Sequence, residues 1–253
     1  MVADWIRVDT TYVKVNPANV LYAASSFSSS STTTNGIGGS TSRFGLLNNR
    51  MYAISYYDLK IFNTADASNP TFVKKTTLNQ GNIETIFPYG NNLFIGSQSG
   101  MFIYSAANPD DLTKLAQFTH VRSCDPVIAD ANTAYVTLHG GTSCGGFSNQ
   151  LDVLDITSLT NPVFIKTYSL TSPRGLAKDG NLLLICDGKA GLKIFSAADA
   201  SNILLLKQVT NLDAQDVITY KSTAIVTTTK GLYFINYSSI ANAKVTSIIP
   251  VKQ

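Results

Sequence analysis

The sequence predicts an all-β fold, a β-propeller of about five four-stranded blades. Three observations support this prediction. Helical spacing of apolar residues is nearly absent, short apolar runs rich in Val, Ile, Leu, Phe, Tyr and Thr are frequent, and these runs recur with a period of about 41 residues. Such runs, separated by Gly, Asn, Asp and Ser, are typical of strands. A repeat of about 40 residues with four strands is typical of a propeller blade.

The repeat is clearest in a strand of the type "MYAI". It begins at Met51, Leu93, Ala134, Leu183 and Ala224, in steps of 42, 41, 49 and 41 residues. The following strand, of the type "LKIF", begins at Leu59, Met101, Leu151, Leu192 and Leu232. A further strand follows each pair, as in "TFVKKTTL" (71–78), and another precedes it, as in "SRFGLLNN" (42–49). Five units in register favour a propeller over an irregular sandwich.

The repeats define a domain of residues 42–253, and residues 1–41 do not fit the pattern. Segments 5–15 ("WIRVDTTYVKV") and 19–25 ("NVLYAAS") resemble strands, whereas residues 25–42 form an uncharged tract of Ser, Thr and Gly that is typical of a mobile loop. Since five blades are already complete without them, we expect the N-terminal strands to pack on the edge of the ring or to belong to an earlier blade. The array is then either complete or part of a larger propeller.

Composition excludes several classes of partner. Charged residues make up 14% and the net charge is +3, without a basic cluster, so we expect no nucleic acid. No apolar run reaches about 18 residues, so no membrane-spanning segment is expected. The start, "MVADWIRVDTT", lacks the pattern of a signal peptide, which leaves a cytosolic protein or a mature or excised portion of a longer one. No cofactor is expected.

The repeats resemble the LVIVD-repeat family, bacterial extracytoplasmic β-propellers akin to YVTN-type propellers. "LDVLDITSLTNPVFIKTYSL" (151–170) carries the resemblance best, and "LKIFNTADASNPTFVKKTTL" (59–78) matches the same frame, whereas "NPDDL" and "SSIANAK" in the second and fifth repeats depart from it. The resemblance implies a secreted, periplasmic or cell-surface location, sometimes with a lipid anchor and with further blades upstream. It brings no catalytic residues with it.

One stretch, residues 119–146, contains two of the three cysteines and both histidines. Cys124 precedes the innermost strand of the third blade, and Cys144 lies in an insertion of about eight residues at 139–150. His120 and His139 end neighbouring strands, so all four residues are expected on one face of the propeller.

Three interpretations of this cluster remain open. A Cys124–Cys144 disulfide would close a loop of about 20 residues and stabilise the fold by roughly 3 kcal/mol in an oxidising compartment. A zinc site would use His120, Cys124, His139 and Cys144, although the tight Cys spacing of specific zinc motifs is missing. The residues could also be unrelated. Cys186, after an apolar strand, is predicted to be free and buried.

The start of each innermost strand should point polar side chains into the central channel. In register these are Ser42, Glu84, Asp125, Arg174 and Gln215. The nearby charges are Arg43, Arg122, Asp187, Asp213 and Asp216, and the aromatic side chains predicted in loops of this face are Tyr56, Tyr57 and Phe147. The mixture of signs suits a small polar ligand, a sugar or a peptide end, and equally a solvated channel with internal ion pairs.

Two classes of function follow. The first is a non-enzymatic binding or scaffold propeller of the cell envelope, which recognises a protein, peptide or glycan through its loops and channel mouth. The alternative is a propeller hydrolase or lactonase that acts on a small polar substrate in the channel. The sequence contains no nucleophile–base motif or metal loop that favours the enzyme, and fold alone does not decide between the two.

Overall fold

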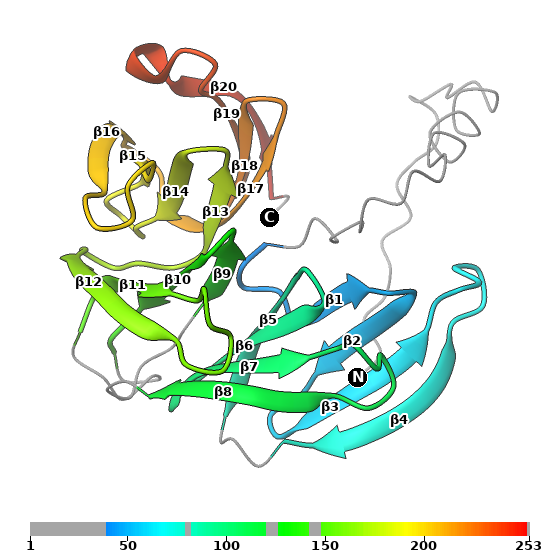
Figure 1. Ribbon diagram of the computed structural model, residues 1–253. Coiled ribbons are helices and arrows are strands. Elements are labelled where there is room, and N and C mark those ends of the chain that lie inside the picture. Colours follow the sequence, from blue (N-terminus) through cyan, green and yellow to red (C-terminus); the bar gives the residue numbers. More distant parts are fainter. Residues whose placement is uncertain (1–38, 79–81, 120–125, 142–147, 252–253) are drawn as a thin grey trace, which may run out of the picture. The chain divides into compact units, whose positions relative to one another are not determined.

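The computed structural model describes residues 39–78, 82–119, 126–141 and 148–251. The chain divides into two units, Met1–Thr33 and Thr34–Gln253, and all described residues belong to the second. They form five antiparallel four-stranded sheets, each from consecutive strands (Figure 1). The predicted five-bladed propeller is therefore confirmed.

The strands have the following bounds. Blade 1 contains β1 (Phe44–Leu47), β2 (Arg50–Ile54), β3 (Asp58–Asn63) and β4 (Thr71–Thr77). Blade 2 contains β5 (Ile83–Tyr89), β6 (Asn92–Ser97), β7 (Gly100–Ser105) and β8 (Thr113–Thr119). Blade 3 contains β9 (Val127–Asp130), β10 (Thr133–Leu138), β11 (Gln150–Asp155) and β12 (Val163–Ser169). Blade 4 contains β13 (Leu176–Asp179), β14 (Leu182–Cys186), β15 (Leu192–Ser196) and β16 (Leu204–Val209), and blade 5 contains β17 (Ala214–Tyr220), β18 (Thr223–Thr228), β19 (Gly231–Asn236) and β20 (Lys244–Pro250).

Helix is almost absent, as predicted. In the part of the chain that the structure describes, the helical element is a single 3-10 turn, η2 (Ile240–Asn242). None of the described residues belongs to a helix long and apolar enough to cross a membrane.

The same backbone devices recur in all five blades. The first two strands are joined by a two-residue turn, and in blade 1 both turn residues, Asn48 and Asn49, have positive φ (53° and 55°), which matches the right-handed twist of a hairpin. A β-bulge interrupts the pairing of the third and fourth strands at one equivalent position, for example between Ile61 and Phe62. Shared bulges and turns give the blades one common twist.

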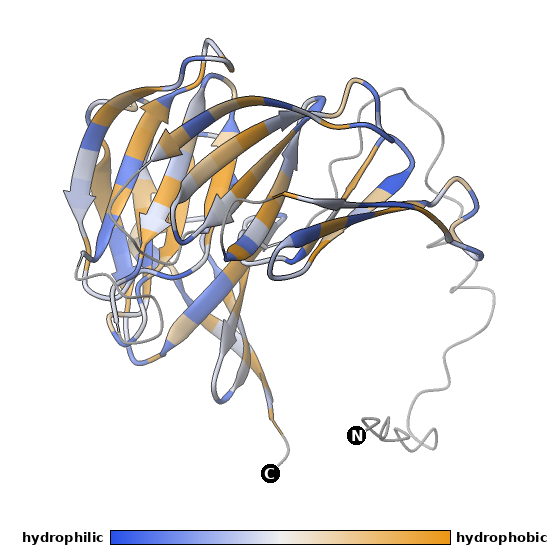
Figure 2. Ribbon diagram, turned by 90° about the horizontal axis from the view of Figure 1, so that it is seen from below, coloured by the Kyte–Doolittle hydropathy of each residue, from blue (hydrophilic) through white to orange (hydrophobic). Residues whose placement is uncertain are grey.

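Hydrophobic packing between neighbouring blades builds the core. Four clusters of buried side chains fill the spaces between blades 1 and 2, 2 and 3, 3 and 4, and 4 and 5. Blades 2, 3 and 4 therefore pack side chains from both of their faces against neighbouring blades, which explains why Phe94, Phe102 and Leu184 are 0% exposed. Figure 2 shows hydrophobic and hydrophilic residues side by side along many of the strands.

Polar contacts also connect the blades. Arg50 of β2 donates two hydrogen bonds to the Asp110 carboxylate of blade 2, at 2.7 and 2.9 Å. The Tyr168 hydroxyl of blade 3 accepts the backbone N–H of Ile203 in blade 4 at 2.9 Å. These bonds fix the outer parts of adjacent blades, while the inner strands leave room at the centre.

Candidate functional site

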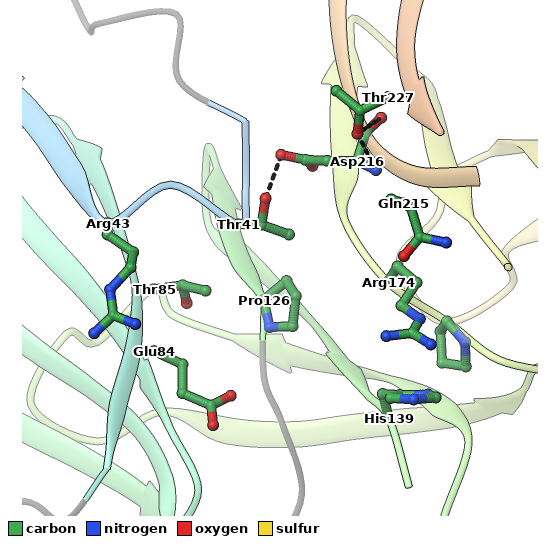
Figure 3. A pocket seen from close by; sticks show the side chains of 11 residues that line it. Thr41, Arg43, Glu84, Thr85, Pro126, His139, Arg174, Gln215, Asp216 and Thr227 are labelled. Atoms are coloured by element: carbon green, nitrogen blue, oxygen red, sulfur yellow. Dashed lines mark hydrogen bonds between the residues drawn. The ribbon is translucent and has the colours of Figure 1, made fainter. Parts of the chain in front are cut away.

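The candidate site is a central pocket of about 420 Å³ to which all five blades contribute. Its lining residues are Thr41 and Arg43 before β1, Glu84 and Thr85 in β5, Pro126 and His139 around blade 3, Pro173 and Arg174 before β13, and Gln215, Asp216 and Thr227 in blade 5. Figure 3 shows these side chains converging from separate sheets. A site assembled in this way exists only when the blades are packed together.

Repetition of the fold explains why these residues meet. Residues at the start of the innermost strand occupy the same place in every blade, and the end of the second strand returns to that place. His139 directly follows β10, and Thr227 is the penultimate residue of β18. Pro126 and Pro173 precede inner strands, where the lack of a backbone N–H costs no ladder hydrogen bond.

Arg174 provides a buried donor with no partner. Its Nε atom is shielded from solvent, and no hydrogen-bond acceptor for it is found among the described residues. Its backbone is fixed, because the Arg174 N–H donates to the Cys186 carbonyl at 2.7 Å and its carbonyl accepts the Thr137 hydroxyl at 2.6 Å. Buried donors are nearly always paired, so a lone one in a pocket indicates that a ligand or water supplies the acceptor.

His139 lies beside Arg174 (Figure 3). Burial lowers the pKa of the His139 imidazole from its ordinary 6.5, and the neighbouring Arg174 charge lowers it further, while a hydrogen bond with Asn149 opposes the change. Burial and the Arg174 charge thus both favour the neutral form of the His139 imidazole over the charged form.

Asp216 also lines the pocket. Its carboxylate accepts the Thr41 hydroxyl at 2.5 Å and the Val217 N–H at 2.9 Å. Two glycines make room for it, because a Cβ atom at Gly39 or Gly175 would lie 2.1 or 1.9 Å from a carboxylate oxygen. Burial raises the pKa of Asp216 above its ordinary value of 3.8, although these hydrogen bonds pull it down.

The remaining polar groups have partners within the protein. The Gln98 amide donates to Glu84 at 2.9 Å, and the Gln215 amide donates to the Asp213 carboxylate at 3.0 Å. The Arg43 guanidinium reaches the Ile83 carbonyl at 3.5 Å. The lining thus combines two guanidinium groups with the carboxylates of Glu84 and Asp216. Of these two carboxylates, Asp216 is the one whose charged form is disfavoured by burial.

The structure brings some of the residues that the sequence predicts for ligand binding to the pocket and places others elsewhere. Glu84, Arg174 and Asp216 line the pocket. Tyr56 and Tyr57 are each 52% exposed, pack edge to face at 4.9 Å and are not among the lining residues. Six further nominated positions lie outside the described residues: His120, Arg122, Cys124, Asp125, Cys144 and Phe147.

Asp187, which the sequence also predicts for ligand binding, has a structural role and is not among the lining residues. It is 0% exposed, forms an ion pair with Lys193 Nζ at 2.6 Å and accepts the backbone N–H groups of Thr171 and Ser172. It therefore ties the turn before blade 4 to β15. Cys186, next to it, is free and buried, as predicted, and burial raises its thiol pKa.

The disulfide and zinc interpretations stay predictions. The proposed bridge, Cys124–Cys144, falls entirely outside the described residues, and of the zinc alternative only His139 is described. Within the described ranges no group of three or more His, Cys, Asp or Glu side chains is placed to hold a metal ion.

Sequence reasoning missed several lining residues. Thr41, Thr85 and Pro126 each stand next to a nominated position, and Pro173 precedes Arg174. Thr227 and His139 come from the end of the second strand, and His139 had been considered only as a zinc ligand. The strand register could have predicted these two residues. The second strand of a blade returns to the face at which the first strand begins, so the residues at its end lie beside the start of the first strand.

Comparisons with known proteins support the fold. No family model matches the chain, and no curated protein matches it. Among solved structures, the protein is similar to a periplasmic gluconolactonase of Pseudomonas aeruginosa (TM-score 0.63, 13% identity, 80% of this chain and 68% of that one) and to a protein of Lactobacillus plantarum (TM-score 0.63, 13% identity, 79% and 67%). It is also similar to a computationally designed protein, Ika8 (TM-score 0.61, 11% identity, 83% and 61%).

These similarities define the class of protein, a β-propeller. The chain spans only about three fifths to two thirds of the length of the solved chains it matches, from 61% to 68%. At these identities the comparisons establish the fold and do not assign an activity.

Proposed function

We propose that the protein is a non-enzymatic binding propeller whose channel pocket recognises a carboxylate-bearing sugar unit of a glycan. The observation that carries this proposal is the buried Nε of Arg174, for which the described residues provide no acceptor, in a pocket lined by all five blades. A guanidinium presents N–H donors in a planar fork that fits a carboxylate.

The charges of the lining support an anionic ligand. Arg43 and Arg174 bring two permanent positive charges, because an arginine side chain stays protonated in proteins. On the acidic side, the lining contains Glu84 and Asp216, and burial disfavours the charged form of Asp216. The two arginines are the lining groups that would pair with a negative group of a ligand.

The size and polarity of the pocket support a sugar. Its volume of about 420 Å³ falls within the range of roughly 300–1,000 Å³ for small-molecule sites. Hydroxyl and amide groups of Thr85, Thr227 and Gln215 complement Arg174 and could exchange hydrogen bonds with sugar hydroxyls. A free peptide C-terminus shares the carboxylate but has no comparable set of hydroxyls.

The cellular setting is part of the proposal. Membership of the LVIVD-repeat family and an extracytoplasmic location rest on the repeat resemblance, and a partner in the cell envelope would provide the glycan. Fractionation of cells that express the natural gene checks this part. Recovery of the protein with the cytosolic fraction would contradict it.

Calorimetric titration tests the ligand class. We expect glucuronate to bind to the protein and glucose to bind much more weakly, because only glucuronate offers a carboxylate to Arg174. The substitution Arg174→Gln should weaken glucuronate binding by about 1.5–3 kcal/mol, roughly 10- to 150-fold, since one charge-assisted contact is lost. Equal affinity of the two sugars for the wild-type protein contradicts the proposal.

Two controls separate the alternatives. Lys244→Gln removes a positive charge from the exposed strand β20 and should leave glucuronate binding unchanged. A short peptide with a free C-terminus is compared with the same peptide carrying a C-terminal amide. Binding of the free peptide but not of glucuronate would replace the glycan with a peptide end.

A second candidate function is hydrolysis of a small lactone. His139 favours it, because its lowered pKa leaves a neutral imidazole that can accept a proton at neutral pH. Water would add to the lactone carbonyl carbon while His139 takes a proton from it. The ring C–O bond would then break as the protonated His139 returns that proton to the ring oxygen, and a hydroxy acid would result. The structural similarity to a gluconolactonase is compatible with this chemistry but does not establish it.

Acid release from gluconolactone, followed with a pH indicator against the spontaneous rate, tests this candidate. An enzyme should exceed the spontaneous rate and lose the excess when His139 is replaced by Gln. A rate equal to that of the heat-unfolded protein excludes it.

A further inference from the structure

A short segment ahead of β1, residues 39–43, bonds to blades 2, 4 and 5, and we call it the brace. Its first four residues form a turn, closed by a backbone hydrogen bond of 3.0 Å between its ends. Within this turn, the Ser40 hydroxyl accepts the Leu176 N–H of blade 4 at 2.7 Å. The Ser42 carbonyl accepts the Ile86 N–H of blade 2 at 3.0 Å. The brace therefore connects blades that are not neighbours in the array.

Asp216 of blade 5 anchors the brace. Its carboxylate accepts the Thr41 hydroxyl at 2.5 Å and the Ser40 hydroxyl at 3.4 Å. The fit is close, because a Cβ atom at Gly39 or at Gly175 would collide with this carboxylate. Ser40 is 1% exposed, and a buried hydroxyl that loses an acceptor is costly. The position of the turn therefore depends on Asp216.

The brace contributes two residues to the lining of the pocket, Thr41 and Arg43. Figure 3 shows Thr41 paired with Asp216, and Arg43 two residues further along the same segment. The Arg43 backbone is held on one side by β2, because its carbonyl accepts the Ile54 N–H at 2.9 Å. Its guanidinium reaches the Ile83 carbonyl at 3.5 Å, which is long for a hydrogen bond. The turn thus supplies the other fixed point that sets where Arg43 lies.

We infer that Asp216 is a positioning residue, which holds Arg43 in place for an anionic ligand through the brace. The inference rests on the proposed function, since that function supplies the ligand. Electrostatics alone predicts the opposite effect, because removal of a carboxylate beside a bound anion strengthens the binding of that anion. The sign of the change in affinity therefore separates positioning from direct repulsion.

Calorimetric titration with glucuronate measures this sign. Asp216→Ala should weaken binding by about 10-fold, the size expected when one charge-assisted contact is lost. Asp216→Asn keeps an oxygen that can accept the Thr41 hydroxyl, so it should bind glucuronate more tightly than Asp216→Ala. Asp111→Ala removes a carboxylate whose side chain is 71% exposed, and this control should leave the affinity unchanged. Unchanged or tighter binding by Asp216→Ala overturns the inference.

A double-mutant cycle shows whether Asp216 acts through Arg43. Arg43→Gln should weaken glucuronate binding, and Arg43→Gln/Asp216→Ala should bind no more weakly than Arg43→Gln alone. Residues that act through one contact give non-additive effects of this kind. Additive losses would mean that Asp216 acts on the ligand by another route, and they overturn the inference.

Amide hydrogen exchange, followed by NMR without ligand, tests the brace itself. The amides of Ile86 and Leu176 donate to the brace, so both should exchange faster in Asp216→Ala than in the wild type. The amide of Ile156 in blade 3 donates to the Asn132 carbonyl at 2.8 Å and should be unaffected. Equal acceleration of all three amides would mean that Asp216 supports the whole fold, and it overturns the specific role.

The two measurements distinguish this inference from the proposed function. If the amides respond as expected and the wild-type protein binds no glucuronate, the proposed ligand is wrong and the brace stands. If the wild-type protein binds glucuronate and the Ile86 and Leu176 amides exchange equally fast in the wild type and in Asp216→Ala, the brace is wrong and the proposed ligand stands.

Discussion

At the scale of single residues, the pocket is defined by how burial acts on three neighbouring side chains. Burial raises the pKa of Asp216 and lowers that of His139, so it favours the neutral form of both. The charge of Arg174 cannot be removed in this way, and its Nε is left without a partner among the described residues. The site therefore offers positive charge chiefly through arginine, which is the basis of the proposed ligand.

The raised pKa of Asp216 predicts a pH-dependent effect of Asp216→Asn. Between pH 3.8 and the raised pKa, the folded state binds more protons than the unfolded state, so the contribution of Asp216 to stability falls as the pH rises. An asparagine has no charge to bury, and the Thr41 hydroxyl can still pair with its side chain. We expect the free energy of unfolding of Asp216→Asn, relative to wild type, to increase from pH 3.5 to pH 7.

Urea unfolding of both proteins across this range measures the difference. A wild-type protein that instead gains stability over the variant as the pH rises would mean that the Asp216 carboxylate is stabilised by its hydrogen bonds more than it is penalised by burial.

The ion pair of Asp187 predicts a large cost for Lys193→Met. Asp187 is 0% exposed, and Lys193 is the cation that neutralises it at 2.6 Å. Removal of one partner leaves an uncompensated buried charge, for which we expect a loss of about 3–5 kcal/mol in the free energy of unfolding. In Asp187→Asn/Lys193→Met most of the loss should be recovered, and a double variant no more stable than Lys193→Met contradicts this role.

At the scale of elements, stability resides in the faces between blades more than in the outer strands. Leu184 in β14 is 0% exposed between blades 4 and 5, whereas Leu204 in β16 is 54% exposed. Both are leucines of the same blade, so their truncation compares the two places directly.

We expect Leu184→Ala to lower the free energy of unfolding by about 2–5 kcal/mol, since a cavity remains in a packed interior. Leu204→Ala should change it by about 0.5 kcal/mol or less, as at other exposed positions. Chemical denaturation followed by far-UV circular dichroism measures both. Similar costs for the two would mean that the outer strand of blade 4 is covered by a partner.

The strands were predictable from sequence because all five blades repeat one pattern of strands and turns. Alternating apolar and polar residues predict the strands, and turn residues such as Asn48 and Asn49 predict where neighbouring strands are joined. Where one repeat is ambiguous, the other four repeats indicate the strand at the same position. The recurring bulge, as at Ile61 and Phe62, has no sequence signal of its own, because it reflects the twist that packing imposes on a whole blade.

At the scale of the whole molecule, the site could be predicted only where the repeat register alone places a residue. Glu84, Arg174 and Gln215 follow from that register and line the pocket. The roles of Asp187 and Lys193 could not be predicted from the repeat register. A charged residue beside the channel and a charged residue buried beneath it occupy the same position in the sequence pattern. The depth of a side chain is a property of the assembled blades.

A crystal structure of the protein with bound glucuronate tests the central claim most directly. The account predicts the sugar in the central pocket, with its carboxylate about 2.7–3.2 Å from Arg174 Nε and its hydroxyls among Thr85, Thr227 and Gln215. A pocket that stays free of sugar at saturating glucuronate, or a sugar bound elsewhere while Arg174 Nε keeps no ligand acceptor, would contradict it.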